Sequence, residues 1–522
     1  SKRGLYIANA AGVPLSICGK MANRHALVAG ATGTGKTVTL QVLAETFCQA
    51  GVPCFMADMK GDLSGIAKEG RMTSYIEKVK DGFGIPDPAF APCPVIFYDV
   101  FGEQGHPMRT TISNMGPQLL SRLMGLNETQ SGVLEIVFRV ADERGLLLID
   151  IKDLRAMLNY VSDHSAELQT TYGNVSTASV GAIQRAILAL ESQGADKFFA
   201  EPAFDIFDLL RVQGGKGVMS VLAADKLMLQ PKLYSTFLLW LLSELYTTLP
   251  EVGDLPLPKL VFFFDEAHML FTDTSKALLD KIEQVIRLIR SKGVGIYFIT
   301  QSPTDIPEVI LGQLGNRVQH ALRAYTPKDQ KAVKTAADTF RANPEFKTDE
   351  AIMNLETGEA LVSFLDEKGA PSVVQRAKVL FPLSQIGAVT EDQRHDIIRQ
   401  SQVYGKYDTP IDRESAFEVL AKEAEEALAA RDEAEADAKE AKGAKTEKKK
   451  AGIVSKVLKA VMTAVTSTLA ALLGTWVSNK VSGKESKSKT SAKEKVVKNA
   501  TSAATRTVTR ELTRDILGNL IK

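Results

Sequence analysis

The chain has 522 residues, of which 45% are hydrophobic and 24% are charged, and its formal net charge is +1 at pH 7. This composition excludes fibrous and wholly disordered proteins and is typical of a globular protein that buries a large core. The length predicts about two or three domains. Because a local patch of cations is enough to bind phosphates, the near-neutral total neither demands nor excludes a nucleic-acid partner.

Cysteine usage and the N-terminal residues bear on the cellular compartment. The four cysteines form no C-x-x-C pair and have no histidine set beside them, which argues against a zinc site. They predict free thiols in a reducing cytoplasm. Residues 1–7 lack the long apolar core of a signal peptide. We therefore expect a cytoplasmic protein, with peripheral membrane association as an alternative that depends on the C-terminal tail. The cysteines are Cys18, Cys48, Cys54 and Cys93.

The first motif is a glycine-rich phosphate loop that follows an apolar run at 25–29. Its spacing, G-x-x-x-x-G-K-T, lets backbone N–H groups curl around a β-phosphate, and its glycines allow the positive φ angles of the turn. We expect Lys36 to reach the β and γ oxygens and the Thr37 hydroxyl to bind Mg²⁺. The apolar spacing that follows predicts a helix whose N-terminus faces the phosphates. The predicted ATP-binding residues are Gly30, Ala31, Thr32, Gly33, Thr34, Gly35, Lys36, Thr37 and Val38.

A second motif supplies acids at the end of a predicted strand. The run at 259–264 is continuously apolar, as in a parallel strand buried on both faces, and Asp265 and Glu266 follow it. Ligands bind at this end of the strands in open α/β sheets. We expect Asp265 to hold Mg²⁺, and we expect Glu266 to polarise the attacking water, which predicts a hydrolase.

A third predicted strand, 295–300, ends in Gln301, whose amide is placed to sense the γ-phosphate or the water. The helix predicted before it, 279–293, carries Arg287 and Arg290 near its C-terminal end. An arginine there can act as a finger on a neighbouring subunit's nucleotide, and Arg290 is the candidate. The alternative is structural, because cations are favoured in the last turn of any helix. Arg317 and Arg323 are reserve candidates.

Hydrophobic patterning predicts an α/β fold with a mainly parallel sheet flanked by helices. Helical periodicity from 100 to 215 predicts an insertion that splits the ATPase core into 1–99 and 216–400. Lys60 follows the strand at 53–58 and either faces a phosphate or only caps the end of that strand. We favour the second role slightly. The predicted strands are 25–29, 53–58, 95–99, 218–223, 260–264, 295–300, 318–322 and 359–365.

Several motifs together resemble the HerA/FtsK superfamily of ring-forming P-loop ATPases. They are the loop GATGTGKT, the segment FMADMKGD at 55–62, the strand FFFDEAH at 262–268, and TQSP at 300–303 followed by LGNR at 314–317. The segments MGP at 115–117, LNETQ at 126–130, LPEVGD at 249–254 and QHALRA at 319–324 are similar to YjgR-type HerA-like proteins.

The resemblance implies a RecA-like ATPase core with a helical insertion, ATP and Mg²⁺ as ligands, a homo-oligomeric ring with a hexamer as one candidate size, and a nucleic-acid motor. HerA itself carries a small β-barrel before its core. Only residues 1–29 precede the phosphate loop, too few for such a barrel, so we expect no function of that barrel here.

The sequence changes character beyond about residue 400. Residues 401–450 predict a charged, solvated or weakly coiled helical linker. Residues 451–522 form a basic tail with amphipathic spacing at 453–477 and 507–521, joined by a Ser/Lys-rich stretch. We favour packing of this tail on the core or a sister subunit over binding to a membrane surface, and over a span of the bilayer.

Two functions fit these patterns. The first is an oligomeric, Mg²⁺-dependent ATP hydrolase that moves DNA, which rests mainly on the resemblance. The alternative is an ATP-driven switch or assembly ATPase that acts on a protein or membrane partner through the tail. A scaffold that binds nucleotide without hydrolysis is disfavoured, because Lys36, Thr37, Asp265 and Glu266 are all present.

Overall fold

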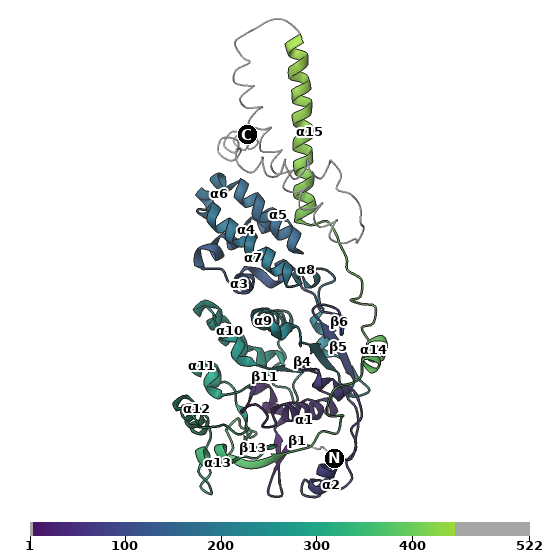
Figure 1. The fold of residues 1–522 in the computed structure, drawn as a ribbon, viewed down its shortest axis with the longest axis vertical. Coiled ribbons are helices and arrows are strands. Elements are labelled where there is room, and N and C mark those ends of the chain that lie inside the picture. The colour runs from purple at the N-terminus through teal and green to yellow at the C-terminus, as the bar shows by residue number, and fades with distance from the viewer. Residues whose placement is uncertain (1–3, 444–522) are drawn as a thin grey trace. The chain divides into compact units, whose positions relative to one another are not determined.

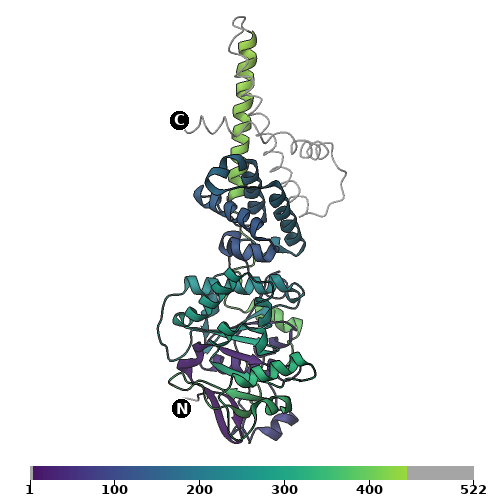
Figure 2. The same ribbon diagram turned by 90° about the vertical axis from the view of Figure 1, so that its left-hand side faces the viewer.

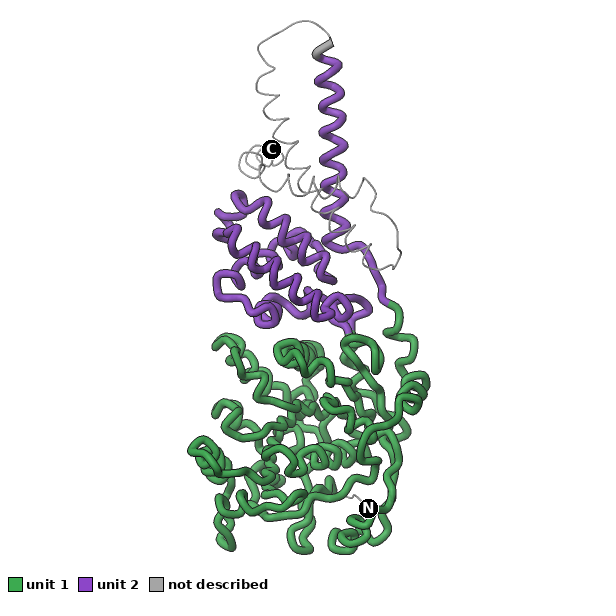
Figure 3. The backbone as a smooth tube through the Cα atoms, in the orientation of Figure 1, with its two compact units in different colours: residues 1–108, 204–409 green, residues 109–203, 410–522 purple. Residues whose placement is uncertain are grey.

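The computed structural model describes residues 4–443 (Figure 1). The chain forms two compact units, coloured separately in Figure 3. Among the described residues, unit 1 comprises 4–108 and 204–409, and unit 2 comprises 109–203 and 410–443. Residues 100–108 and 204–215, assigned above to the insertion, thus group with unit 1. The predicted tail at 451–522 lies outside the described residues, so its docking stays a prediction.

Unit 1 is built on a twelve-stranded sheet in the order β2-β1-β14-β13-β12-β3-β11-β10-β4-β9-β5-β6. From β12 to β6 all neighbours run parallel, and the other pairs are antiparallel. The predicted α/β class with a mainly parallel sheet is confirmed. The strands are β1 Leu5–Ala10, β2 Val13–Ile17, β3 Ala26–Ala29, β4 Cys54–Asp58, β5 Val95–Asp99, β6 His106–Pro107, β9 Met219–Ala223, β10 Leu260–Phe264, β11 Val294–Thr300, β12 Asn316–Gln319, β13 Glu359–Ser363 and β14 Gln375–Val379; β7 Val212–Gln213 and β8 Lys216–Gly217 pair separately.

Helices cover both faces of this sheet, as Figures 1 and 2 show. On one face Val261 and Phe263 of β10 belong to the core that includes Phe47 of α1. On the other face Phe264 meets the ring of Tyr234 from α9, with centroids 6.2 Å apart. The continuous apolar run of β10 is therefore explained by burial on both sides. The helices of unit 1 are α1 Lys36–Gln49, α2 Ser74–Val79, α9 Pro231–Thr248, α10 Lys276–Ile289, α11 Glu308–Leu311, α12 Pro327–Asp338, α13 Thr348–Asn354 and α14 Glu391–Arg399.

Unit 2 is helical. Several of its helices begin at capping residues, and Asn127 and Asp150 each close a capping box at the start of α4 and α5. These caps satisfy N–H groups that a helix leaves without partners. The helices are α3 Ile112–Met124, α4 Glu128–Glu143, α5 Ile151–Asp163, α6 Ser165–Tyr172, α7 Thr177–Ser192, α8 Ala195–Phe198 and α15 Ala416–Gly443. No helix among residues 4–443 has the length and apolar character needed to cross a membrane.

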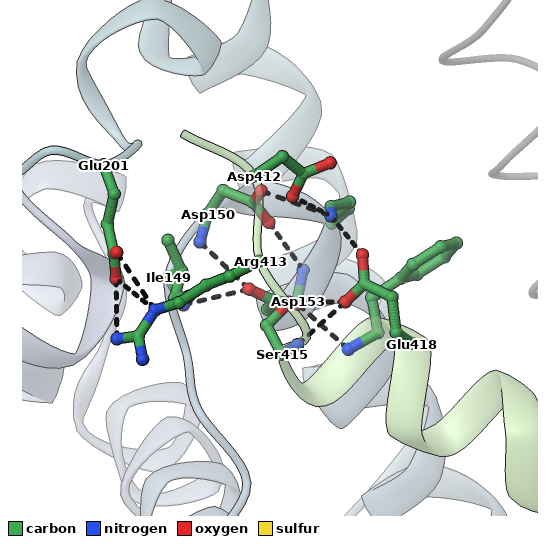
Figure 4. A network of polar contacts seen from close by, with 10 residues as sticks. Ile149, Asp150, Asp153, Glu201, Asp412, Arg413, Ser415 and Glu418 are labelled. Atoms are coloured by element: carbon green, nitrogen blue, oxygen red, sulfur yellow. Dashed lines mark hydrogen bonds and ion pairs between the residues drawn. The ribbon is translucent and has the colours of Figure 1, made fainter. Parts of the chain in front are cut away.

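The first turns of α15, within the stretch predicted as a charged helical linker at 401–450, are buried in unit 2. Ala416, Phe417, Leu420 and Ala424 are core residues at helical spacing. The chain before α15 is fastened through Asp153, which is fully buried (Figure 4). The Asp153 carboxylate accepts hydrogen bonds from the backbone N–H groups of Ile149, Asp150 and Phe417, and Ser415 Oγ lies 2.6 Å from it.

Candidate nucleotide-binding site

The carboxyl ends of three parallel strands, β3, β11 and β10, meet at one edge of the sheet of unit 1. Ala29 and Thr300, which end β3 and β11, are paired in register. Gly30 and Gln301 therefore leave the sheet at the same level. β10 lies beside β11 and ends at this edge as well, which brings Asp265 next to them. The motifs that the sequence separates by hundreds of residues thus converge where open α/β sheets bind ligands.

A cavity of about 480 Å³ opens at this edge. The sequence-predicted residues that line it are Thr32, Gly33, Gly35, Lys36, Thr37, Val38, Asp265, Glu266 and Gln301. Its wall also contains Leu40, Met59, Lys60, Asp62, Leu63, Met228, Ile299 and Thr357, which were not predicted as site residues. Gly30, Ala31 and Thr34 are not in the wall and belong to the base of the loop.

The phosphate loop has the backbone shape that its glycines allow. Gly33 and Gly35 have φ values of 79° and 107°, which residues other than glycine rarely adopt. Thr34 Oγ1 donates to the Ala31 carbonyl at 2.6 Å and closes the turn. Gly35 is the N-cap of α1, and no side chain caps this helix. The first turn of α1, whose N–H groups have no side-chain cap, lines the cavity, as a phosphate site requires.

His320, which sequence reasoning missed, supports the loop from behind. Its ring is fully buried, and its Nε2 lies 2.7 Å from Thr39 Oγ1 of α1. A Cβ placed on Gly30 would come within 2.5 Å of His320 Cβ, so only glycine fits there. The carbonyl of Ala321, the residue after His320, accepts a hydrogen bond from the Ala31 N–H at 2.9 Å. Burial lowers the pKa of His320 to about 4, so the ring is neutral at physiological pH.

The two acids after β10 are held in different ways. Asp265 Oδ1 accepts a hydrogen bond from the Glu266 N–H at 2.8 Å, and the Asp265 carbonyl accepts one from Tyr234 Oη at 2.7 Å. Burial, together with the charge of Glu266, raises the pKa of Asp265 to about 6. Glu266 has a φ of 51°, a left-handed conformation that costs energy for a residue with a side chain. Its Oε2 lies 3.3 Å from His268 Nδ1.

Two lysines reach the cavity without a partner. The Lys36 and Lys60 side chains form no hydrogen bond or ion pair with any residue of 4–443. Burial lowers the pKa of Lys36, because the cationic form is desolvated. Lys60 lines the cavity, contrary to the slightly favoured interpretation of it as a residue that only ends β4.

The arginines lie away from this cavity. Arg290 is exposed in a short helix, Arg290–Lys292, directly before β11. It therefore sits at the amino edge of the sheet, roughly 20 Å of strand away from Gln301. Arg287 pairs with Glu283 at 3.2 Å. Arg317 donates to backbone carbonyls in the preceding turn, which makes it structural, and Arg323 is exposed.

Comparison with known proteins identifies the family. The family described as "Helicase HerA-like C-terminal" matches residues 5–522. The chain belongs to this family. The HerA-like chain is 29% identical over 99 residues to the DNA double-strand break repair helicase HerA of Sulfolobus acidocaldarius, and the match covers 19% of each protein. The chain thus spans about a fifth of the length of that curated relative.

Solved structures also resemble this HerA-like chain. The plasmid coupling protein TrwB in complex with ADP and Mg²⁺ is 16% identical, with a TM-score of 0.49, and the alignment covers 74% of this chain and 92% of TrwB. VirB4 of Thermoanaerobacter pseudethanolicus is 16% identical, with a TM-score of 0.46, and the alignment covers 75% and 98%. The predicted membership in the HerA/FtsK type of P-loop ATPases is confirmed by the family match.

Proposed function

We propose that this HerA-like protein is a Mg²⁺-dependent ATP hydrolase that works in an oligomeric ring as a motor on DNA. One observation carries the hydrolase: Lys36, Thr37, Asp265, Glu266 and Gln301 line a single cavity at the carboxyl edge of the sheet. These are the residue types that phosphoryl transfer requires, namely a phosphate cradle, a metal-binding acid, and a carboxylate that positions water.

The cavity fits a magnesium ion that arrives with the nucleotide. Within residues 4–443 no three His, Cys, Asp or Glu side chains form a metal site of their own. The Thr37 hydroxyl and the Asp265 carboxylate are hard oxygen donors in one wall, and Mg²⁺ is typically held by one or two such groups plus phosphate oxygens. When bound there, the ion neutralises charge on the β and γ oxygens.

The protein's own groups account for the remaining chemistry. Glu266 orients a water molecule, whose oxygen forms a bond to the γ-phosphorus while the bond from that phosphorus to the β–γ bridging oxygen breaks. The water proton passes to the Glu266 carboxylate, and ADP and inorganic phosphate leave. Lys36 and the N–H groups of the loop stabilise charge on the β and γ oxygens. Gln301 hydrogen-bonds the water or the γ-phosphate.

We assign the arginine finger to Arg290, acting on the nucleotide of a neighbouring subunit. Because Arg290 lies at the amino edge of its own sheet, it cannot reach its own cavity, and only an assembly gives it a nucleotide. Mixing Arg290→Ala subunits with Glu266→Gln subunits should restore part of the turnover that each variant alone lacks. Full turnover from a strictly monomeric protein would rule the assignment out.

Family membership supports DNA as the polymer, since the matched curated relative is named a DNA repair helicase. The deciding experiment measures ATP turnover of the full chain alone, with double-stranded DNA, with single-stranded DNA and with liposomes. Glu266→Gln serves as the inactive control. Stimulation by DNA supports the motor. Stimulation by liposomes only, lost when residues 453–522 are deleted, favours the alternative switch on a membrane partner. No turnover in the parent protein under any condition contradicts the hydrolase.

A further inference from the structure

Lys60 occupies a position in the cavity that the proposed mechanism does not use. β4 pairs in register with β10, Phe55 beside Phe262, so Asp58 ends β4 level with Asp265. Lys60 follows two residues later and lines the cavity. In the sheet order β3-β11-β10-β4, the strand with the acids lies between the strand of the phosphate loop and the strand that precedes Lys60.

The turn that carries Lys60 is rigidly built, although the Lys60 side chain is exposed. The buried carboxylate of Asp58 accepts a hydrogen bond from the Leu63 N–H at 3.3 Å. Ser64 Oγ donates to the Gly61 carbonyl at 2.8 Å and accepts from the Val389 N–H at 3.0 Å. Hydrogen bonds therefore fix the backbone on the C-terminal side of Lys60, while the cation itself projects free of any partner among the described residues.

The side chains that line the cavity carry more negative than positive charge, so a bound triphosphate needs the charge of Lys60. Three carboxylates, Asp62, Asp265 and Glu266, line the wall, against two lysines. A triphosphate adds further negative charge, and without Lys60 only Lys36 would face it from the protein side chains of the wall. Preorganised cations stabilise phosphoryl transfer because the charge on the γ oxygens is spread in the transition state.

We propose that Lys60 is a catalytic residue that binds the γ-phosphate of ATP from the side opposite Lys36. This proposal rests on the hydrolase proposed above and adds a second phosphate-binding cation to it. A β-phosphate held by the loop places the γ-phosphate toward the acids of β10, and the turn after β4 lies on their far side. Lys60 then contacts ATP but not ADP, and it stabilises the phosphoryl group as the bridging bond breaks.

The first test measures binding without turnover. In the Glu266→Gln background, the affinities of the full chain for Mg·ATP and Mg·ADP are compared by calorimetry. Lys60→Met should weaken ATP binding about tenfold while ADP binding stays constant, and Lys60→Arg should retain most of the preference for ATP. Lys276→Met is the matched control, because Lys276 is an exposed lysine on α10 outside the cavity.

The second test measures turnover in the parent background. Lys60→Met should lower kcat about 100-fold, as the loss of one preorganised donor does in other enzymes, with partial rescue in Lys60→Arg. If Lys60→Met lowers the affinities for ATP and ADP equally, Lys60 has only a structural role and does not contact the γ-phosphate. Parent-like binding and turnover in Lys60→Met would also overturn the proposal. If the parent protein binds ATP but never hydrolyses it, the hydrolase fails, whereas the ATP-to-ADP ratio still decides the contact of Lys60.

Discussion

The cavity of unit 1 and the segment before α15 in unit 2 use charged side chains in opposite ways. In the cavity of unit 1, Lys36 and Lys60 have no partner among the described residues, although both lie near carboxylates. In unit 2, Lys152 lies within 2.6 to 3.6 Å of the carboxylates of Asp150, Asp412 and Glu418. Burial opposes the charge of Lys152, but the hydrogen bond to Glu418 and the other carboxylates hold its pKa above the ordinary value.

This difference distinguishes charged side chains that are available to a ligand from charged side chains that stabilise the fold through ion pairs. Lys36 is desolvated and its side chain has no protein partner, which costs stability, and under the proposed function the nucleotide supplies the missing charge. A cation surrounded by carboxylates contributes to the fold and has no capacity left for a ligand. The comparison therefore predicts which substitutions change binding and which change stability.

The largest expected effect is the difference between removing the Lys36 side chain and removing the Lys152 side chain. Lys36→Ala should weaken ATP binding by roughly 100-fold or more, because the phosphates lose a desolvated cation. Its midpoint of unfolding should stay constant or rise, since an unpaired and partly buried charge is removed. Lys152→Ala should do the reverse, with a lower midpoint and parent-like ATP affinity. Calorimetry and urea denaturation of the three proteins provide the measurements. A loss of stability without loss of affinity in Lys36→Ala would break the comparison.

The next effect concerns the buried carboxylate of Asp153. All of its hydrogen-bond partners are donors. An asparagine at this position would therefore place its side-chain NH₂ group, which is also a donor, against backbone N–H groups. We expect Asp153→Asn to cost about 3 kcal/mol in the free energy of unfolding and to release the start of α15. Hydrogen exchange should show lost protection at Phe417. Asp142→Asn on the exposed face of α4 is the control, and an equal effect there would contradict the argument.

The sequence predicted the parts of the site whose chemistry is local. The phosphate loop, Asp265 with Glu266, and Gln301 each follow an apolar strand directly, and the strand order brings them together. By contrast, His320 acts through Thr39, which lies 281 residues earlier, and no local pattern indicates such a pairing. The position of Arg290 was implicit in the sequence, because a helix that precedes a strand ends at that strand's amino edge.

On the antiparallel side of the sheet β13 was predicted, at 359–365, but β1, β2 and β14 were missed, for a different reason. β14 alternates buried and exposed residues, with Ala377 and Val379 inside, so a period of two was present but short. Most of β2 is exposed, and it is recognisable only by its pairing with β1. Parallel strands buried on both faces are easier to predict, because their apolar runs are continuous.

A smaller effect should appear on acidification. Because the pKa of Asp265 is raised to about 6, its protonated fraction grows as the pH falls through that value. Only the ionised carboxylate binds Mg²⁺, so the apparent affinity for Mg²⁺ in the presence of ATP should fall about tenfold per pH unit below about pH 6. Asp265→Asn should weaken Mg²⁺ binding at every pH and leave only the shallower dependence that comes from protonation of the γ-phosphate of ATP. A flat profile in the parent protein would remove Asp265 from the metal site.

The smallest expected effect belongs to the ion pair that stands out in Figure 4, Arg413 with Glu201. Its three N···O distances are 2.9 to 3.1 Å, yet 55% of the Arg413 side chain is exposed. Exposed pairs contribute little, because water screens them and two long side chains lose freedom. The backbone already joins these segments, since the Ile411 N–H donates to the Glu201 carbonyl at 2.7 Å.

Arg413→Ala should therefore leave the urea midpoint of unfolding within experimental error of the parent, and any residual difference should vanish at about 1 M salt. The contrast with Asp153→Asn sharpens the comparison, because both residues fasten the chain before α15 and they differ chiefly in burial. If the loss of Arg413 destabilised the protein as much as Asp153→Asn, burial would not be what decides the contribution of a charge in unit 2. The number of partners around each group would then be the better guide, for the fold and for the cavity alike.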